Sequence, residues 1–262
     1  MDLGLEGRTA IVMGASQGLG EACAHQLAIE GAHVILVSRR EKELKQVRNS
    51  IEERGGSAEL IVCDLFEGAS RKKLRNLISA MARVDILIAN SGGPAPGTAP
   101  GISSDIWLKE FDAMVLGIIE IIDETVGNMR GSGFGRIIVI GSSGMVCPIP
   151  KLAVSNTLRS AVGGYLKTLA EQVAALGITC NMVLPGRVET PRTKAIDIST
   201  AKAMKISEEQ ARQNSVAVIP AGRYGRPDEF GSVVAFLASE QAGYITGSQI
   251  RVDGGAIRSV NT

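Results

Sequence analysis

The sequence predicts an α/β protein of three layers, α/β/α, in which helices cover both faces of a doubly wound parallel sheet of about seven strands. Two observations predict this fold. Short segments that are apolar on both faces alternate with longer segments of helical character, as buried parallel strands and their crossover helices do. The chain has 262 residues, 45% of them hydrophobic, which is enough to bury a full core.

The expected strands follow the apolar runs along the chain. They cover residues 9–13, 34–38, 59–63, 84–89, 136–140, 178–184 and 249–252. The charge-rich segment 41–54 predicts a helix with a solvated face. The segment 92–101 carries several prolines and glycines directly after the fourth run, so it predicts a loop at the carboxyl end of the sheet. Ligands of doubly wound proteins bind at this edge.

We expect residues 1–262 to form one domain, because no linker-like stretch divides the chain. The segment 191–220 is polar and partly helical, and it is the one sizeable interruption of the alternation between strands and helices. An insertion of this kind next to a binding edge is a candidate lid.

Composition excludes several classes of function. The formal net charge is +1, so there is no electrostatic argument for binding nucleic acid or an anionic membrane. The four cysteines lie far apart and form no C-x-x-C pair, which argues against a metal site and against a disulfide framework. No segment has the length of a membrane span or the pattern of a signal peptide. We therefore expect a cytoplasmic protein without metal.

A glycine-rich turn follows the first expected strand and leads directly into a helical pattern. Gly14, Gly18 and Gly20 allow a tight turn and a close approach of the backbone to a ligand. The free N–H groups and the positive dipole end of the next helix favour an anion there. A nucleotide phosphate is the expected ligand, and the alternative is a turn of the same shape that binds nothing.

Further short motifs follow this turn in a fixed order. They are Cys63-Asp64-Leu65, Asn90-Ser91-Gly92-Gly93, Ile140-Gly141-Ser142-Ser143, Asn181-Met182-Val183-Leu184-Pro185-Gly186 and Val252-Asp253-Gly254-Gly255. In order and spacing the chain resembles the short-chain dehydrogenase/reductase family, and within it the 3-oxoacyl-[acyl-carrier-protein] reductase branch. The resemblance implies a Rossmann-type fold, a nicotinamide dinucleotide cofactor and assembly into a homodimer or homotetramer.

The resemblance also implies which residues bind the cofactor. They are Gly14, Ser16, Gln17, Gly18, Leu19, Gly20, Ser38, Arg39, Arg40, Asp64, Leu65, Asn90, Gly92, Arg159, Pro185, Gly186, Val188 and Thr190. Asp64 follows a strand and can accept the adenine amino group, or it can be the N-cap of a helix that starts at Leu65. The Asn90 amide can bind backbone across the sheet, although an ordinary turn would use the same residue. The segment from Pro185 to Thr190 resembles the one that contacts the nicotinamide carboxamide.

The residues after the second strand favour NADP(H) over NAD(H). An NAD site places a carboxylate there for the ribose 2′-hydroxyl, whereas an NADP site needs a cation for the 2′-phosphate. This chain has Ser38, Arg39 and Arg40 and no acid at that point. Guanidinium groups suit a phosphate well. The alternative is that the two arginines only begin a charged surface helix.

The catalytic positions depart from the family pattern. Ser142 matches the family's serine, but Ser155 and Arg159 stand where a tyrosine and a lysine are expected, and Met114 stands where an asparagine is expected. No Y-x-x-x-K occurs anywhere in the chain. A serine hydroxyl is a far weaker acid than a tyrosine, and an arginine stays protonated, so the usual proton donor is missing. Ser142, Ser155 and Arg159 remain as candidate catalytic residues.

Two functions follow from this pattern. The first is an NADP(H)-dependent oxidoreductase that reduces a carbonyl or oxidises an alcohol, with Arg159 either stabilising an oxyanion or gripping a substrate carboxylate. Arg187 and Arg192 add positive charge near the same mouth, which favours an anionic small molecule or an acyl-carrier-linked substrate. The blander interpretation of these arginines is local salt bridges at the rim. The second function is a non-catalytic NADP(H)-binding protein with a regulatory or scaffold role.

Two long apolar segments are candidates for the helices that would pair in an assembly. They are residues 105–129 and 153–175, and the second contains Gly163 and Gly164, which allow close helix approach. The alternative is ordinary packing of both helices against their own sheet.

Overall fold

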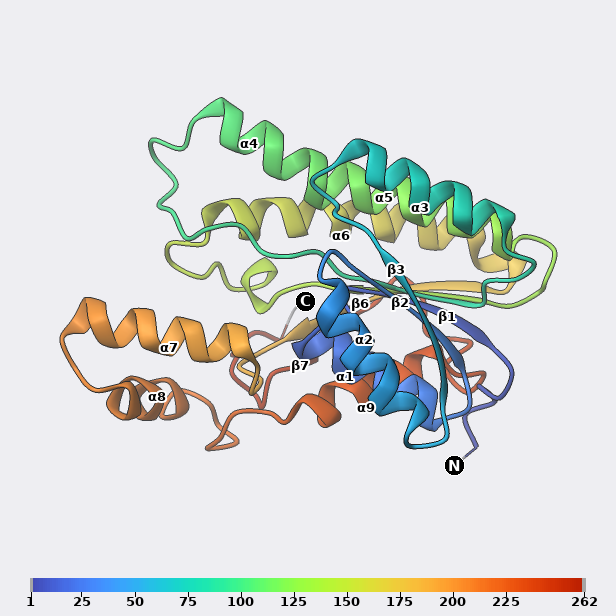
Figure 1. Ribbon diagram of the computed structural model, residues 1–262. Coiled ribbons are helices and arrows are strands. Elements are labelled where there is room, and N and C mark those ends of the chain that lie inside the picture. The colour runs from blue at the N-terminus through green and yellow to red at the C-terminus, as the bar shows by residue number, and fades with distance from the viewer. Residues whose placement is uncertain (1, 261–262) are drawn as a thin grey trace.

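A computed structural model describes residues 2–260 and has seven parallel strands in one central sheet (Figure 1). The order of the strands across the sheet is β3-β2-β1-β4-β5-β6-β7, so the chain winds outward first in one direction and then in the other. The strands are β1 Thr9–Met13, β2 His33–Ser38, β3 Ser57–Val62, β4 Ile86–Ala89, β5 Gly135–Ile140, β6 Ile178–Pro185 and β7 Gln249–Val252. The predicted doubly wound α/β fold is confirmed, and each strand lies within a few residues of its expected place.

Helices cover both faces of the sheet. One face carries α1 Gly18–Ile29, α2 Glu41–Glu52 and α9 Pro227–Ala238, and the other carries α3 Gly68–Ala80, α5 Gly117–Met129 and α6 Ala153–Val173. Two short 3₁₀ turns complete these connections, η2 Ser143–Met145 and η3 Ala174–Leu176. The reversal of winding between β1 and β4 opens a crevice at the carboxyl ends of the strands, which is where doubly wound proteins bind ligands.

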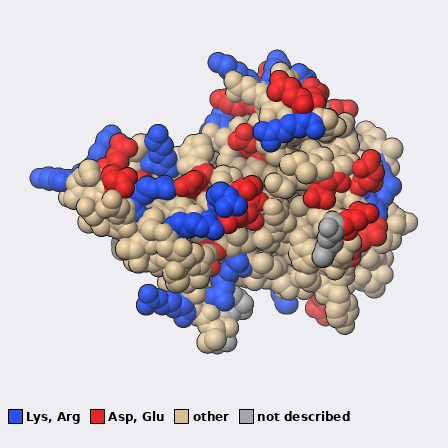
Figure 2. Space-filling model, turned by 90° about the horizontal axis from the view of Figure 1, so that it is seen from below, with Lys and Arg blue, Asp and Glu red and all other residues tan. Residues whose placement is uncertain are grey.

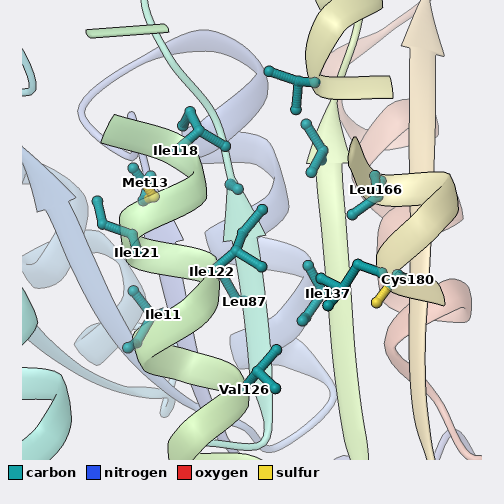
Figure 3. Packing of buried hydrophobic residues seen from close by; sticks show 14 of the residues in the cluster. Ile11, Met13, Leu87, Ile118, Ile121, Ile122, Val126, Ile137, Leu166 and Cys180 are labelled. Carbon is teal, nitrogen blue, oxygen red and sulfur yellow. The ribbon is translucent and has the colours of Figure 1, made fainter. Parts of the chain in front are cut away.

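Alternation along each strand feeds two separate cores. On β1, Ile11 and Met13 face α3, α5 and α6, whereas Ala10 and Val12 face α1, α2 and α9. Figure 3 shows the first core, where side chains of α5 such as Ile122 reach strand residues such as Leu87. Strands that are buried on both faces explain why the apolar runs predicted them so well.

The long apolar segment 105–129 is not one regular helix. It consists of α4 Ser104–Phe111, a π-helical turn η1 Asp112–Leu116 and α5, so the chain gains an extra residue in the turn between the two helices. Such π turns are frequent at functional sites. This one holds Met114, which is buried against the end of the sheet.

The segment that interrupts the alternation forms two helices beside the sheet, α7 Pro191–Met204 and α8 Glu208–Val216. Figure 1 shows them extending away from the layered body, and Figure 2 shows Lys and Arg side chains gathered toward this end of the molecule. Thr190 caps α7 by accepting a hydrogen bond from the Thr193 N–H at 3.3 Å.

Within the described residues 2–260, no helix is long and apolar enough to cross a membrane, and no group of three or more His, Cys, Asp or Glu residues is arranged to hold a metal ion. Cys23, Cys63 and Cys180 are buried free thiols, while Cys147 is exposed.

Candidate active site

The glycine-rich turn between β1 and α1 has a shape that side chains would prevent. Gly14 has φ +65°, and a Cβ there would lie 2.5 Å from Nδ2 of Asn90 at the end of β4. A Cβ on Gly20 would lie 2.3 Å from the carbonyl oxygen of Gly14. Both glycines are therefore required by close approach of the backbone, and the N-terminus of α1 opens toward the carboxyl edge of the sheet.

Asn90 does not make the hydrogen bond that the sequence suggested. Its side-chain amide packs against Gly14 and forms no hydrogen bond with other residues in the range 2–260. The expectation that it binds backbone across the sheet is wrong for this structure. Next to it, a Cβ on Gly92 would meet nothing within 4 Å, so the chain leaves open space directly after β4.

A cluster of polar groups lies beside the glycine turn at the end of β2. Arg40 donates from Nη2 and Nε to Ser16 Oγ at 2.8 and 3.2 Å, and from Nη1 to Gln17 Oε1 at 2.7 Å. Ser16 Oγ lies 2.8 Å from Ser38 Oγ. These acceptors are all neutral, and Arg40 forms no ion pair within residues 2–260, although its charge acts on the nearby carboxylate of Glu21. A phosphate monoester is the kind of ligand that such a cluster suits.

Arg39 points elsewhere. Its side chain is 64% exposed, and Nη1 lies 3.5 Å from Oδ2 of Asp64 at the end of β3. Asp64 also accepts a hydrogen bond from the Phe66 N–H at 3.0 Å, which turns the chain after the strand. Helix α3 begins only at Gly68, with Glu67 at its N-cap, so Asp64 is not the cap of a helix that starts at Leu65.

The loop after β6 lies over the glycine turn. The Gly186 N–H donates to the carbonyl oxygen of Val252 at 2.9 Å, and buried Val188 forms a bridge with Gly225. Thr190 then contacts the turn, because a Cβ on Gly18 would lie 3.5 Å from the Thr190 side chain. The N-cap of α7 therefore lies against the turn that leads into α1, and Leu19 packs against the core formed with α1, α2 and α9.

The structure places Arg159 at the carboxyl ends of two neighbouring strands. Its Nη1 donates to the carbonyl oxygen of Ile140, the last residue of β5, at 2.8 Å, and its Nη2 donates to the carbonyl oxygen of Ser91 at 3.3 Å. Burial, followed by the charge of Arg192, lowers the pKa of Arg159 to about 10. The guanidinium remains charged at neutral pH, and no carboxylate within residues 2–260 pairs with it.

The two serines differ in how they are held. Ser142 caps the turn η2, and its Oγ accepts a hydrogen bond from the Gly144 N–H at 3.1 Å, which leaves its own hydrogen free to donate. Ser155 is one turn before Arg159 on α6 and is buried, and its hydroxyl makes no hydrogen bond with the rest of the described chain. Ser155 and Arg159 lie on one face of the helix, as their spacing predicted.

A small apolar cavity lies beneath Arg159. Its volume is about 10 Å³, and its lining includes Met114, Ile118 and Met182 together with the arginine. A cavity of this size is at the lower limit for one water molecule, and these side chains offer such a water few partners. The methionine at position 114 is thus part of a mostly apolar lining beside the guanidinium.

Arg192 was only a general source of charge in the sequence, and the structure gives it a definite place. It stands in the first turn of α7, and its guanidinium packs on Gly93, where a Cβ would lie 2.5 Å from Nη2. It forms no ion pair within residues 2–260. Arg192 and Arg159 thus bring two guanidinium groups without a compensating acid to the loop after β4 and the end of β5.

Arg187 does not add to that charge as the sequence suggested. Its Nη1 lies 3.9 Å from Oδ1 of Asp197 on α7, and Asp197 also accepts hydrogen bonds from the Tyr224 hydroxyl at 3.0 and 3.1 Å. This group ties α7 to the loop after β6 and to the segment before α9. For Arg187 the simpler interpretation, a local salt bridge, is the one the structure shows.

Comparison with known proteins shows which family shares this fold and these sequence motifs. The fold is that of the doubly wound nucleotide-binding α/β class. A family model described as enoyl-(acyl carrier protein) reductase matches residues 14–256. The chain belongs to the short-chain dehydrogenase/reductase family, as the sequence motifs predicted.

Relatives and solved structures cover almost the whole chain. A 3-oxoacyl-[acyl-carrier-protein] reductase FabG of Rickettsia felis is 33% identical, with 97% of this chain and 98% of the relative aligned. The NADPH-dependent reductase BacG of Bacillus subtilis is 32% identical, with 97% and 99% aligned. The crystal structure of L-sorbose reductase from Gluconobacter frateurii, complexed with NADPH and L-sorbose, is 28% identical with a TM-score of 0.93, covering 99% of this chain and 100% of that one.

Proposed function

We propose that the protein is an NADP(H)-dependent oxidoreductase that reduces a carbonyl group, or oxidises the corresponding alcohol, with Arg159 at the centre of an altered active site. The observation that carries this proposal is the position of Arg159, whose charged guanidinium is fixed by two strand-end carbonyl groups at the binding edge of the sheet. NADPH-dependent reductases among the relatives and structural neighbours support the class of reaction.

The residues at the sheet edge fit this cofactor. The tight glycine turn, whose path depends on Gly14 and Gly20, presents the N-terminus of α1 to a diphosphate, and Ser16, Ser38 and Arg40 form the cluster for the 2′-phosphate. When bound, NADPH supplies the hydride. NAD(H) would leave the Arg40 guanidinium without an anionic partner, so it is the weaker ligand.

The remaining cofactor contacts follow the chain around the cleft. Asp64 and Leu65 face the adenine, the open backbone after Asn90 and at Gly92 faces the nicotinamide ribose, and the segment 185–190 faces the carboxamide. Gln17, Gly18 and Leu19 complete the turn. Arg39 lies at the rim, where it pairs with Asp64 and contributes less than Arg40 to binding of the 2′-phosphate. Thr190, which touches the turn, closes the cleft from above.

In this site Arg159 takes over part of the work of a tyrosine and a lysine. Its charge stabilises the negative charge that develops on the carbonyl oxygen, and Ser142 donates its free hydroxyl hydrogen to the same oxygen. Arg159 holds its protons at neutral pH, so the proton that completes the alcohol comes from water through Ser142 and Ser155. Without a positioned acid the reaction is about two to four orders of magnitude slower than with one.

The charge of the site favours an anionic small molecule as substrate. Arg159, which is desolvated, and Arg192, which is exposed, have no carboxylate partner among the described residues, and guanidinium groups bind carboxylates in a bidentate manner. The names of the FabG relatives support the alternative of an acyl-carrier-linked substrate. Arg159 and Arg192 would then bind a phosphate group of that substrate. The helices α7 and α8 form the lid of this site, and Arg192 comes from the lid.

We also propose that two copies of the chain, or four, associate through α5 and α6. Leu116, the last residue of η1 directly before α5, is exposed, and Gly164 on α6 has open space around its Cα, so a second pair of helices can approach closely. Light scattering after size exclusion at micromolar concentration is expected to give a dimer or tetramer, and a monomer would contradict this.

The proposed activity is tested by NADPH oxidation with a panel of aldehydes, ketones and keto acids. We expect slow turnover that favours keto acids over the matching keto amides. Arg159→Met is expected to abolish turnover while cofactor binding persists, and Arg192→Gln is expected to remove the preference for the acid. NADPH binding without turnover on the whole panel would favour the second candidate, a non-catalytic NADP(H)-binding protein. The absence of the family's tyrosine and lysine from positions 155 and 159 supports this candidate.

A further inference from the structure

Helix α3 carries one arginine that is buried among three different elements. Arg71 lies in the first turn of α3, and its side chain is only 7% exposed. Helices α3 and α5 lie side by side on one face of the sheet (Figure 1). Nothing in the proposed reaction uses this guanidinium, yet every one of its nitrogens has a partner.

The side chain of Arg71 joins the loop after β3 to the π turn η1 and to α5. Nη1 donates to the carbonyl oxygen of Leu65 at 2.6 Å, and Nη1 and Nη2 together donate to the two carboxylate oxygens of Asp112 at 2.9 Å each. Nε donates to Glu120 at 3.3 Å. Burial works to lower the pKa of Arg71, but the hydrogen bonds and charges of Asp112 and Glu120 outweigh it and raise the pKa. The planar fork of an arginine suits such simultaneous contacts, which a lysine cannot make.

The helix opposite is shaped to admit this side chain. A Cβ on Gly117, the first residue of α5, would lie 2.8 Å from Cδ of Arg71. Asp112 begins the π turn, so the two acceptors on this side belong to the turn and to α5. The passage for Arg71 thus depends on a glycine at the point where the π turn ends.

The loop after β3 and the π turn, which Arg71 joins, both border the proposed cofactor site. Leu65 and Asp64 follow β3, where the adenine is proposed to lie. The π turn contains Met114, which lines the cavity under Arg159. Within residues 2–260, the Leu65 carbonyl oxygen is the only backbone acceptor among the hydrogen bonds of the Arg71 side chain, and this bond fixes the path of the chain directly after Asp64.

We propose that Arg71 is a positioning residue for the adenine half of the cofactor: it holds the loop after β3 against the π turn, so that Asp64 and Leu65 keep the shape that receives the adenine. This inference rests on the proposed nucleotide site but not on the reductase activity.

The test measures binding of 2′,5′-ADP, the adenine half of NADP(H), by isothermal titration calorimetry together with thermal unfolding. Arg71→Met keeps the packing beside Gly117 and removes the hydrogen bonds, and we expect it to raise the dissociation constant about tenfold. Arg75→Met is the matched control, because Arg75 lies within 3.8 Å of Glu120 and Glu124 but contacts neither Leu65 nor Asp112. The control is expected to bind 2′,5′-ADP within about twofold of the unaltered protein.

Arg71→Lys provides a second variant that keeps the charge and the fold. One ammonium group cannot hold Asp112 by a fork and reach Leu65 as well, so we expect weakened 2′,5′-ADP binding here too. A lower unfolding temperature with unchanged 2′,5′-ADP affinity in both Arg71 variants would make Arg71 a structural residue only and overturn the proposal. Failure of the unaltered protein to bind 2′,5′-ADP would overturn the nucleotide site as well, whereas absent reductase activity would leave this result untouched.

Discussion

Replacing Arg40 by alanine tests the basis of cofactor choice. In the structure Arg40 is partly buried and directs its guanidinium at Ser16 and Gln17, all through neutral acceptors. A 2′-phosphate in this cluster would replace neutral acceptors by a charged one, and a hydrogen bond to a charged group contributes about 1.5 to 3 kcal/mol. Arg40→Ala is therefore expected to weaken NADPH binding about 10- to 150-fold. NADH, which lacks the phosphate, is expected to change by no more than about twofold.

Arg39→Ala is the matched control for this prediction. Arg39 carries the same charge one residue earlier, but it is exposed and paired loosely with Asp64, a kind of contact that contributes about 0 to 1 kcal/mol. The assay is calorimetric or fluorescence titration of each variant with both cofactors. A larger loss of NADPH affinity in Arg39→Ala than in Arg40→Ala, or an equal loss of NADH and NADPH affinity, would refute the assignment.

Three further predictions concern the turn and the catalytic positions. Burial raises the pKa of Glu21, in the first turn of α1, although the Gly18 N–H and Arg40 act to lower it, so this carboxylate gains a proton as the pH falls and then repels a diphosphate less. NADPH titrations should therefore show affinity rising toward low pH. Glu21→Gln should bind NADPH about two- to fivefold more tightly than the unaltered protein near neutral pH and lose that pH dependence. Gly20→Ala, whose Cβ would meet backbone, should weaken NADPH binding more than tenfold in the same titration, and unchanged binding would contradict the cradle. Ser155→Tyr combined with Arg159→Lys should raise kcat about 10²- to 10⁴-fold on any carbonyl that the unaltered protein reduces, and a folded double variant with no gain would show that proton donation does not limit the rate.

The sheet could be predicted from the sequence because its strands are buried on both faces. An apolar run such as 136–140 needs no knowledge of its neighbours to be recognised, and β5 Gly135–Ile140 matches it almost residue for residue. The π turn could not be predicted. Its residues suit an α-helix as well, and the extra residue is stabilised by Arg71, which comes from a helix about forty positions away along the chain.

The candidate site was predictable in its members but not in their pairings. Adjacent residues of like charge, Arg39 and Arg40, leave a strand in different directions, and only one of them faces the glycine turn. Arg187 and Arg192 both follow β6, which ends at Pro185, yet buried Asp197 neutralises the first and leaves the second free to reach Gly93. Spacing along one helix, as for Ser155 and Arg159, is set by local geometry, whereas these pairings depend on tertiary contacts.

Transfer of deuterium from NADPH that carries deuterium at both C4 positions to a carbonyl compound, followed by mass spectrometry of the product, tests the central claim most directly. We predict deuterium in the alcohol product with the unaltered protein and none with Arg159→Met, although Arg159→Met still binds NADPH. Binding of NADPH without deuterium transfer to any member of an aldehyde, ketone and keto-acid panel would contradict the account, and so would transfer that continues unchanged in Arg159→Met.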